Sequence, residues 1–400
     1  MNSILSFAAL ALFYFQIVTI FPKHAVAQLY QPEINALQDM RNNLDDLPGS
    51  TFFSSWVFSS DPCTNFSGVV CISINGVNHV SVLSLGTINA GSAGLTGVLS
   101  PSVGNLSFLR ILTIVPGDLQ GSIPDSVGRL SLLEFLGLPE NKLSGNIPDS
   151  LQNLHSLRDL VLKNNQLSGS VPTGLCILPS LNTLDLSGNG LSGTIPSFSA
   201  PLSFLDLQRN FLTGTLPPLP ASLISLSLSK NNLNGPLDQL ASLQILQFLD
   251  LSFNQFSGTI PAAIFNSRLT NLMLQRNQLS GYVLPAEPVS IANIDLSYNY
   301  LSGNLSSSLA SAQNIYLNNN KFSGSLPQAF VASILDGTLK SLYLQHNYLV
   351  TSNIDPATSL PVSSIFCIRY NCMIPPAQSS CPSNAGKQAT RPASQCQEEL

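Results

Sequence analysis

Apolar residues recur along most of the chain in a fixed frame, in which two of them flank a single residue and an asparagine follows three positions after the second. The stretch LDLSGNGLSGTIP, residues 184–196, shows the frame, and residues 136–148, 160–172, 205–217, 249–261 and 315–327 repeat it. The framing pairs begin at Leu83, Leu112, Leu136, Leu160, Leu184, Leu205, Leu226, Leu249, Leu272, Ile294, Ile315 and Leu342, and a degenerate unit begins at Phe366. The asparagines from Asn141 to Asn347 lie 21 to 27 residues apart.

This spacing predicts a solenoid of leucine-rich repeats. The two framing side chains of each unit point inward from a short strand, because successive strand side chains alternate between faces. One turn cannot bury its own leucines, but stacked turns pair their strands at about 4.8 Å and merge the leucines into one core. Twelve units give a concave sheet roughly 55 Å long. We expect each asparagine amide to satisfy backbone groups at the strand exit, and the following Gly and Pro to build the convex return.

Charge is scarce, at 9% of residues against about 25% in typical soluble domains. The net charge of −5 and the pI near 5.3 leave no basic field for phosphates, so we expect no nucleic-acid partner.

The first 27 residues read as a secretory signal peptide, with an apolar run over residues 4–21 and the small residues AVA at 25–27. The mature chain is then expected to start at Gln28, although an apolar run of that length is also compatible with an uncleaved anchor. No later stretch is apolar enough for a membrane span. Three glycosylation sequons, at Asn65, Asn105 and Asn304, fit the secretory route.

Six of the seven cysteines lie in two terminal groups, which predicts disulfide caps in a secreted chain. One group is Cys63 and Cys71; the other is Cys367, Cys372, Cys381 and Cys396. At the C-terminal end we prefer Cys367 with Cys372 and Cys381 with Cys396 by proximity alone, and three arrangements are open. Cys176 lies among repeat leucines and is expected to be a buried apolar residue.

The motif L-x-x-L-x-L-x-x-N-x-L-S-G-x-I-P, over about residues 80–350, resembles the plant extracellular leucine-rich repeat family. That family includes receptor-kinase ectodomains, receptor-like proteins and polygalacturonase-inhibiting proteins, and the resemblance implies a right-handed, twisted superhelix. The helical pattern of residues 32–47, followed by SSWVFSSDPC, resembles its N-terminal cap. We therefore expect a signal peptide (1–27), an N-terminal cap (28–79), repeats (80–350), a C-terminal cap with a degenerate repeat (351–381) and a flexible tail (382–400).

The sequence also departs from the family pattern. Residues 88–94 form an insertion in the first repeat, Gly117 stands where the second repeat should have its asparagine, and repeats from Leu202 onward shorten to about 21 residues. The family's receptors continue into a transmembrane helix, whereas residues 381–400 are too polar for one.

No catalytic motif is present, and His79, His155 and His346 are too far apart in a solenoid to share a metal. Asp185, Asp206, Asp250 and Asp295 recur in the LDLS-type strands and are expected to form a solvated row. We therefore predict neither an enzyme nor a cofactor.

Function is expected on the concave face, at the strand positions that point away from the core. The candidate partner-binding residues are Phe204, Arg209, Lys230, Phe248, Phe253, Met273, Arg276, Tyr298, Tyr316 and Tyr343, with Thr113, Val115, Phe135, Glu140, Asp159, Val161 and Lys163 earlier and His346 later. Exposed aromatic residues beside arginine are typical of a contact surface. Arg209, Lys230 and Arg276 share one repeat offset and are candidates for receiving a carboxylate, unless Asp206 and Asp250 neutralise them.

The leading hypothesis is a secreted recognition protein of the plant apoplast or cell wall that binds a protein or peptide, such as a receptor kinase, in signalling or defence. Association with the plasma membrane would then run through that partner. Two alternatives stay open: an inhibitor of a microbial wall-degrading glycosidase, and a structural wall protein without a discrete ligand.

Overall fold

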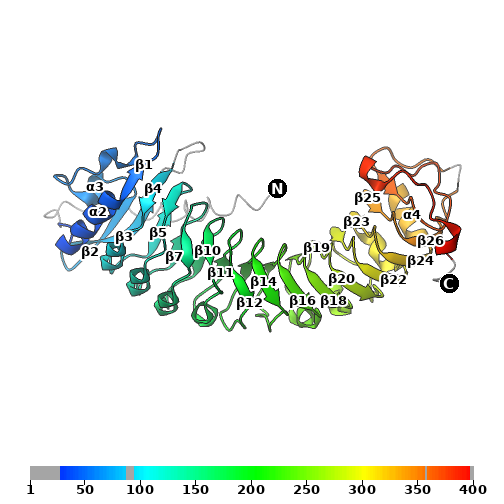
Figure 1. Cartoon of the computed structure of the whole chain (residues 1–400), viewed down its shortest axis with the longest axis horizontal. Coiled ribbons are helices and arrows are strands. Elements are labelled where there is room, and N and C mark those ends of the chain that lie inside the picture. The colour runs from blue at the N-terminus through cyan, green and yellow to red at the C-terminus, as the bar shows by residue number, and fades with distance from the viewer. Residues whose placement is uncertain (1–27, 87–93, 356–357, 397–400) are drawn as a thin grey trace.

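The computed structural model describes residues 28–86, 94–355 and 358–396. The expected signal peptide, and all of the 88–94 insertion except Gly94, lie outside these residues. The described chain forms an elongated arc with a sheet along its inner, concave side (Figure 1).

The N-terminal cap closes one end of the core. It comprises α2 (Gln31–Asn43), β1 (Leu44–Asp46), η2 (Phe52–Ser55), α3 (Pro62–Asn65) and the hairpin of β2 (Val69–Ile74) and β3 (Val77–Leu85). Trp56 packs against Phe53 and Phe66, and its indole N–H donates to the Ser67 carbonyl at 2.9 Å. The predicted Cys63–Cys71 disulfide is confirmed.

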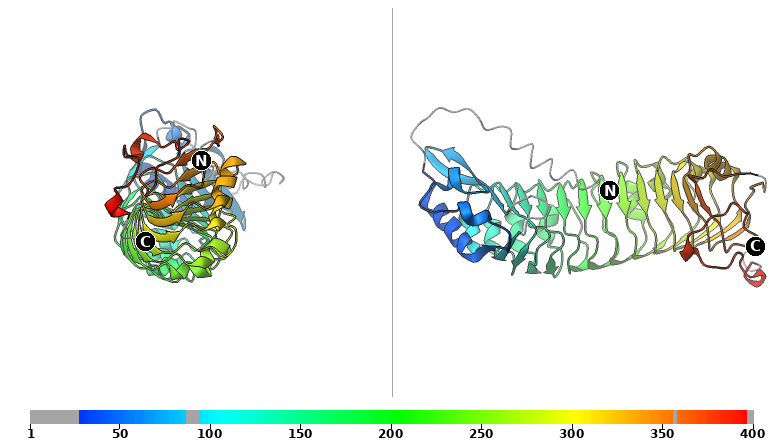
Figure 2. Two further views of the ribbon diagram at one scale, coloured as in Figure 1. Left: turned by 90° about the vertical axis from the view of Figure 1, so that its right-hand side faces the viewer. Right: turned by 90° about the horizontal axis from the view of Figure 1, so that it is seen from above.

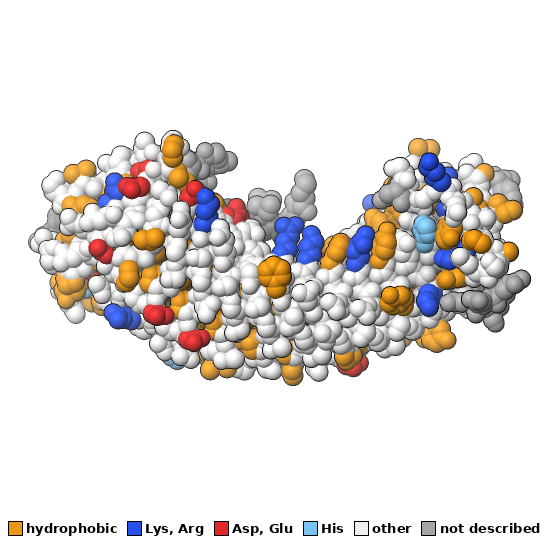
Figure 3. Space-filling model, in the orientation of Figure 1, with side chains coloured by type: hydrophobic (Ala, Val, Ile, Leu, Met, Phe, Trp, Pro, Cys, Tyr) orange, Lys and Arg blue, Asp and Glu red, His pale blue; other side chains and the backbone are white. Residues whose placement is uncertain are grey.

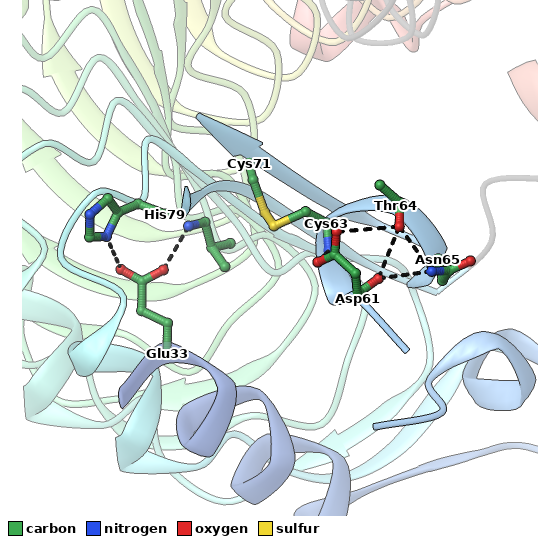
Figure 4. The surroundings of a disulfide bond; sticks show 8 residues. Glu33, Asp61, Cys63, Thr64, Asn65, Cys71 and His79 are labelled. Carbon is green, nitrogen blue, oxygen red and sulfur yellow. Dashed lines mark hydrogen bonds and ion pairs between the residues drawn. A yellow bond between two sulfur atoms is a disulfide. The ribbon is translucent and has the colours of Figure 1, made fainter. Parts of the chain in front are cut away.

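Glu33 fixes helix α2 to strand β3. Its side chain is fully buried, and its carboxylate accepts the Val80 backbone N–H at 2.7 Å and lies 2.9 Å from Nδ1 of His79 (Figure 4). A buried carboxylate is tolerated only when it is bonded in this way. His79 therefore has a structural role in the cap.

The concave sheet has fourteen strands within the described residues, and every strand after β3 is parallel to its neighbour. The thirteen framing positions identified in the sequence all lie in it, and Leu184 stands in register between Leu160 and Leu205. After β3 the strands are β5 (Ile111–Ile114), β7 (Phe135–Gly137), β9 (Asp159–Val161), β11 (Thr183–Asp185), β13 (Phe204–Asp206), β15 (Ser225–Ser227), β17 (Phe248–Asp250), β19 (Asn271–Met273), β21 (Asn293–Asp295), β23 (Asn314–Tyr316), β25 (Ser341–Tyr343) and β27 (Ile365–Cys367). The framing leucines are fully buried, so the repeats share one core (Figure 2).

A second, parallel sheet is formed by the segments that follow the strands of the concave sheet. Its strands are β12 (Ser192–Thr194), β14 (Phe211–Gly214), β16 (Asn232–Gly235), β18 (Gln255–Gly258), β20 (Gln278–Gly281), β22 (Tyr300–Asn304), β24 (Lys321–Ser325) and β26 (Tyr348–Thr351). Nearer the N-terminus, β4 (Leu95–Val98) and β6 (Asp118–Gln120) join β1, and β8 (Ser144–Asn146) pairs with β10 (Gln166–Ser168). The Ser-Gly step bends these strands, as at Gly258 with φ of +80°, a conformation that glycine adopts without strain.

Short helical turns complete most repeats. They are η3 (Pro101–Asn105), η4 (Asp125–Arg129), η5 (Asp149–Asn153), η6 (Thr173–Ile177), η7 (Asp238–Ser242), η8 (Ala262–Asn266), η9 (Ser307–Ser311) and α4 (Gln328–Leu335), followed at the C-terminal end by η10 (Ser383–Ala385) and η11 (Ala393–Gln395). In the described chain no such turn occurs between β12 and β16. The two 21-residue repeats that begin at Leu184 and Leu205 therefore lack the helical turn and keep both strands.

A ladder of buried asparagines runs the length of the solenoid. Oδ1 of Asn231 accepts the Leu212 backbone N–H at 3.0 Å, while its Nδ2 donates to the carbonyls of Leu207 at 2.9 Å and Leu228 at 3.0 Å. The pattern extends to Asn371 in the degenerate last repeat. Each amide thus links two successive turns.

The second repeat departs from the ladder for a steric reason. A Cβ at Gly117 would lie 2.5 Å from the Leu95 carbonyl oxygen, so a side chain does not fit there. The close approach accompanies the small sheet of β1, β4 and β6.

The C-terminal disulfides are Cys367–Cys381 and Cys372–Cys396, so the preferred sequence pairing was wrong. The chain returns along the last strand, where the Ser380 N–H donates to the Phe366 carbonyl at 2.8 Å and brings Cys381 beside Cys367. Cys372 lies beyond the strand exit, on the other side of Asn371. Proximity along the chain was therefore a poor guide to proximity in space.

Residues 382–396 form a further layer on the last repeat and differ from the expected flexible tail. The Tyr370 N–H donates to the Ala389 carbonyl and the Arg391 N–H to the Asn371 carbonyl, both at 2.8 Å. The Arg391 guanidinium lies over the Tyr348 and Tyr370 rings, with its Cζ 4.0 and 4.8 Å from their centroids. The segment covers the open end of the core.

Cys176 is buried as predicted, and burial raises the pKa of its thiol to about 12. A thiol with that pKa stays protonated and is a poor nucleophile at neutral pH.

We expect Asn231→Ala to lower the free energy of unfolding by about 2 kcal/mol, because it leaves the buried Leu212 N–H unpaired and removes one of the two amide bonds accepted by each of the Leu207 and Leu228 carbonyls. Urea denaturation measures the change. The matched control is Asn232→Ala, whose side chain is exposed at the next position, and it should change stability by less than about 0.5 kcal/mol. Equal losses in both variants would contradict the ladder's role.

Non-reducing peptide mapping of the secreted protein is expected to recover Cys367 linked to Cys381 and Cys372 linked to Cys396. Recovery of Cys367 linked to Cys372 would contradict the described arrangement of the C-terminal cap.

Candidate ligand-binding surface

The concave face is built from strand residues that alternate with the buried leucines. Phe204, Phe248, Met273, Tyr316 and Tyr343 all lie in this sheet and are half-buried. The rings of Tyr316 and Tyr343, on neighbouring strands, stack with centroids 5.0 Å apart and an interplanar angle of 17°. The sheet thereby presents fixed aromatic surface beside the strand exits.

A second set of side chains stands immediately before the ladder asparagines. We define the exit column as Arg209, Lys230, Phe253, Arg276 and Tyr298, which occupy this position in five consecutive repeats and are all exposed. Figure 3 shows basic and hydrophobic side chains alternating along the middle of the hollowed edge.

Every residue of the exit column has a left-handed backbone, with φ between +55° and +57°. This conformation costs an ordinary L-residue roughly 1–2 kcal/mol. In other repeats the same position holds Asn164, Gly188 and Asn319, which adopt this conformation more readily, and also Glu140, His346 and Tyr370. The fold therefore accepts a less strained residue here, and the large side chains of the exit column are not required for folding.

The exit column is a continuous series of cation–π contacts over its last four residues. Nζ of Lys230 lies 5.6 Å from the Phe253 ring centroid. Cζ of Arg276 lies 5.3 Å from the same centroid and 4.2 Å from the ring centroid of Tyr298. Such contacts stabilise each cation by about 0.5–1 kcal/mol at exposed sites and hold the side chains in place.

The cations of the exit column have no ion-pair partner within 4.0 Å among the described residues, although earlier repeats pair their charges. Lys163 lies 3.8 Å from Glu140, and Lys142 lies 2.8 Å from Asp118. Arg209, Lys230 and Arg276 therefore place three unpaired cations at one repeat offset of the described concave edge.

The aspartate row forms no ion pair within 4.0 Å with the exit column in the described structure, although the charge of Arg276 acts on Asp295 and opposes the effect of burial on its pKa. Asp206 accepts the backbone N–H and the Nε2 of Gln208 at 2.9 and 3.0 Å, and Asp185 accepts the N–H and hydroxyl of Ser187 at 3.1 and 2.6 Å. Asp295 is held by Ser297 in the same way. Each carboxylate turns back onto its own strand exit.

The prediction of a solvated row was wrong for Asp185 and Asp206, which are 5% and 8% exposed. Burial, and next the charge of Asp185, raise the pKa of Asp206 to about 7. Burial also raises the pKa of Asp185 and Asp295. Asp206 is therefore largely neutral in mildly acidic solution and contributes little charge to the concave face there.

Two glutamines were not identified from the sequence. Oε1 of Gln275 and Oε1 of Gln345 are buried without a hydrogen-bond partner among the described residues. Gln275 directly precedes Arg276 in the sequence. An unpaired buried acceptor costs about 1–3 kcal/mol.

Residues 382–396 cover His346, which stands directly before Asn347 and therefore occupies the same repeat position as the exit column. Nε2 of His346 lies 3.1 Å from the Ala385 carbonyl, and its ring contacts Tyr370 at 4.8 Å between centroids. His346 therefore belongs to the cap. Tyr370 and Arg391, whose contact completes the C-terminal cap, were not identified from the sequence.

Other predicted sites are placed as follows. Thr113 is half-buried and donates to the Ser84 hydroxyl at 3.0 Å. Asn65, Asn105 and Asn304 are exposed, and their glycosylation stays a prediction. Across the described residues, no group of three or more His, Cys, Asp or Glu is arranged to hold a metal ion.

Within the described ranges, no helix has the length and apolar character needed to cross a lipid bilayer.

Family comparisons assign both the cap and the repeats. Residues 31–72 match the leucine rich repeat N-terminal domain, and residues 131–191, 201–223 and 246–267 match leucine rich repeat families. The chain is 38% identical over 84 residues to the LRR receptor-like serine/threonine-protein kinase EFR of Arabidopsis thaliana, covering 21% of this chain and 7% of that protein. It is 32% identical over 134 residues to Receptor-like protein 13 of the same plant, covering 26% and 12%. The chain thus spans only a small part of these relatives.

Solved structures show the same fold. A plant peptide hormone receptor, RGFR1 in complex with RGF2, has a TM-score of 0.66 and 30% identity over 72% of this chain and 48% of that one. The PEPR1–AtPEP1 complex has a TM-score of 0.63 and 28% identity over 80% and 49%, so this chain spans about half of each receptor. A plant ice-binding protein has a TM-score of 0.56 and 28% identity over 75% and 90%.

The solenoid, the disulfide-linked ends and the family matches agree with one another. The chain is a leucine-rich repeat protein with a leucine rich repeat N-terminal domain, of the kind found in plant receptor kinases and receptor-like proteins.

Proposed function

We propose that this protein recognises a peptide or protein partner on its concave face, outside the cell, in cell-surface signalling. The observation that carries the proposal is the exit column, where five successive repeats hold large exposed side chains on a left-handed backbone, although the fold does not require large side chains there. Strained residues persist where function maintains them. Aromatic side chains and arginine together are the composition of interaction hot spots.

The relatives support the same function. The receptor RGFR1 is a plant peptide hormone receptor in complex with RGF2, and its fold covers 72% of this chain. Two disulfide-linked ends fit an oxidising, extracellular compartment. We place the contact on the strand residues Tyr316 and Tyr343 as well as on the exit column, because both lie on the hollowed side of the sheet.

We expect Tyr316→Ala/Tyr343→Ala to reduce capture of the partner by about thirtyfold or more, since removing hot-spot aromatic rings typically costs about 2 kcal/mol or more. The measurement is chemical cross-linking of the purified secreted protein to plant extracellular extract, with cross-linked peptides identified by mass spectrometry. The matched control is Ile177→Ala/Ile245→Ala, which removes exposed apolar side chains next to convex turns. Undiminished capture by the tyrosine variant would reject concave-face recognition.

A second candidate function is binding to ice, suggested by the ice-binding protein whose length this chain covers to 90%. Small polar residues on successive strands of the second sheet form a staggered row, in which each is offset by two residues in register from the next. The row is Ser192, Thr213, Asn234, Ser257, Ser280, Ser302 and Ser323. Phe211, Tyr282 and Tyr300 protrude from the same sheet with exposures of 62%, 64% and 56%, which breaks its flatness and makes this the weaker candidate.

An ice-recrystallisation assay decides this candidate. If the second sheet binds ice, the protein slows crystal growth at micromolar concentration, Ser257→Lys/Ser302→Lys abolishes the effect, and Tyr316→Ala/Tyr343→Ala leaves it unchanged. Crystal growth identical to that in buffer would remove ice binding.

A further inference from the structure

We propose that the exit column binds an extended acidic peptide segment in which two acidic side chains flank one apolar side chain at alternate positions. The inference rests on the proposed concave-face recognition and specifies the chemistry of the partner. The first acidic group lies between Arg209 and Lys230, the apolar group contacts Phe253, and the second acidic group meets Arg276.

The charge of the partner follows from the ion pairs of the protein itself. Among the described residues, Arg209, Lys230 and Arg276 have no carboxylate within 4.0 Å, whereas Lys163 and Lys142 in earlier repeats do. In a chain with only 16 Lys and Arg among 400 residues, three unpaired cations in four consecutive repeats form a distinct positive site. A carboxylate partner gains charge-assisted hydrogen bonds there without breaking an internal ion pair.

The nearby aspartates form no ion pair within 4.0 Å with these cations in the described structure. Hydrogen bonds from Gln208 and Ser297 hold Asp206 and Asp295 against their own strand exits. The raised pKa of Asp206, about 7, also keeps that carboxyl largely protonated at mildly acidic pH. An incoming acidic group therefore meets cations rather than existing pairs.

The spacing of the partner follows from the strand spacing. Arg209 and Arg276 lie three strands apart, at β13 and β19, which is roughly 14 Å at about 4.8 Å per strand. An extended peptide rises about 3.4 Å per residue, so residues i and i+4 are separated by roughly 14 Å and point to the same side as i+2. The central residue then lies near Phe253, whose ring is 42% exposed.

An acidic polysaccharide fits the column less well than a peptide. A polyuronate carries a carboxylate on every unit and no apolar side group, so it would place charges against Phe253 and Tyr298. The net charge of −5 also opposes long polyanions more than a short segment with two charges.

The test uses fluorescein-labelled peptides with the core Glu-Ser-Leu-Ser-Glu, its Gln-Ser-Leu-Ser-Gln analogue, and the isomer Glu-Leu-Ser-Ser-Glu, which turns the leucine to the opposite face. Fluorescence anisotropy with the whole secreted protein at about 50 mM salt is expected to show binding of the first peptide about tenfold tighter than either analogue. Raising the salt concentration to about 0.5 M should weaken binding of the first peptide, because salt screens exposed charges.

Two charge-reversal variants with an equal change of charge, one in the exit column and one outside it, locate the site. Arg209→Glu/Arg276→Glu should lose at least about tenfold in affinity for the first peptide, and Arg209→Gln/Arg276→Gln should lose somewhat less. Arg268→Glu/Lys340→Glu, at exposed residues just before β19 and β25, should stay within about twofold of the parent protein. Circular dichroism melting verifies that all variants are folded.

Equal affinity for the Glu and Gln peptides, or equal losses in the two charge-reversal variants, would overturn the proposal. Tighter binding of an oligogalacturonide to the same column would replace the peptide by an acidic polysaccharide. If none of the peptides binds while Tyr316→Ala/Tyr343→Ala still loses the cross-linked partner, concave-face recognition stands and only the acidic segment is rejected. If the tyrosine variant also captures the partner as well as the parent protein does, the proposed function itself is rejected.

Discussion

The buried asparagine at each strand exit is the interaction on which the rest of the structure depends. Its amide bonds a backbone N–H of the previous turn and carbonyls of both turns, as at Asn231, so the stacking of repeats and the exit of the chain from the sheet are fixed together. The residue before it is then forced into the left-handed conformation and toward solvent. A structural requirement of every repeat thus creates an outward position that recurs along the concave edge, and the sequence can fill it for binding.

The fold follows from the sequence because its signals are local and repeated. The framing leucines, the asparagines and the cysteines of the N-terminal cap all lie where the spacing predicts, since each makes the same contact in successive turns. The C-terminal pairing of Cys367 with Cys381 did not follow, because it depends on the path of a non-repeating segment. The burial of Asp206 did not follow either, because the LDL pattern places it on the outward side without showing that its carboxylate folds back to Gln208. The left-handed column was accessible in principle, since Gly188 and Asn164 occupy the same offset as Arg209.

Scarcity of charge gives each unpaired ion in this molecule more weight. With 9% charged residues, little background field masks the three cations of the exit column. The cation–π contacts with Phe253 and Tyr298 hold Arg276 without neutralising it, because an aromatic ring offers a quadrupole and no net charge. The column is therefore ordered before any partner arrives, which lowers the entropy lost on binding.

Both ends of the column are closed, and this closure sets the length of the site. Toward the N-terminus, Glu140 pairs with Lys163, so the concave edge is already neutralised there. Toward the C-terminus, the layer of residues 385–391 covers His346 and Tyr370, and Arg391 occupies the space between aromatic rings that a ligand cation or ring would otherwise use. Between these limits the exit column is the stretch where charge is unpaired and rings are open to solvent. A site bounded in this way selects a short segment rather than a long polymer, because the column position holds no further Lys or Arg beyond Arg276.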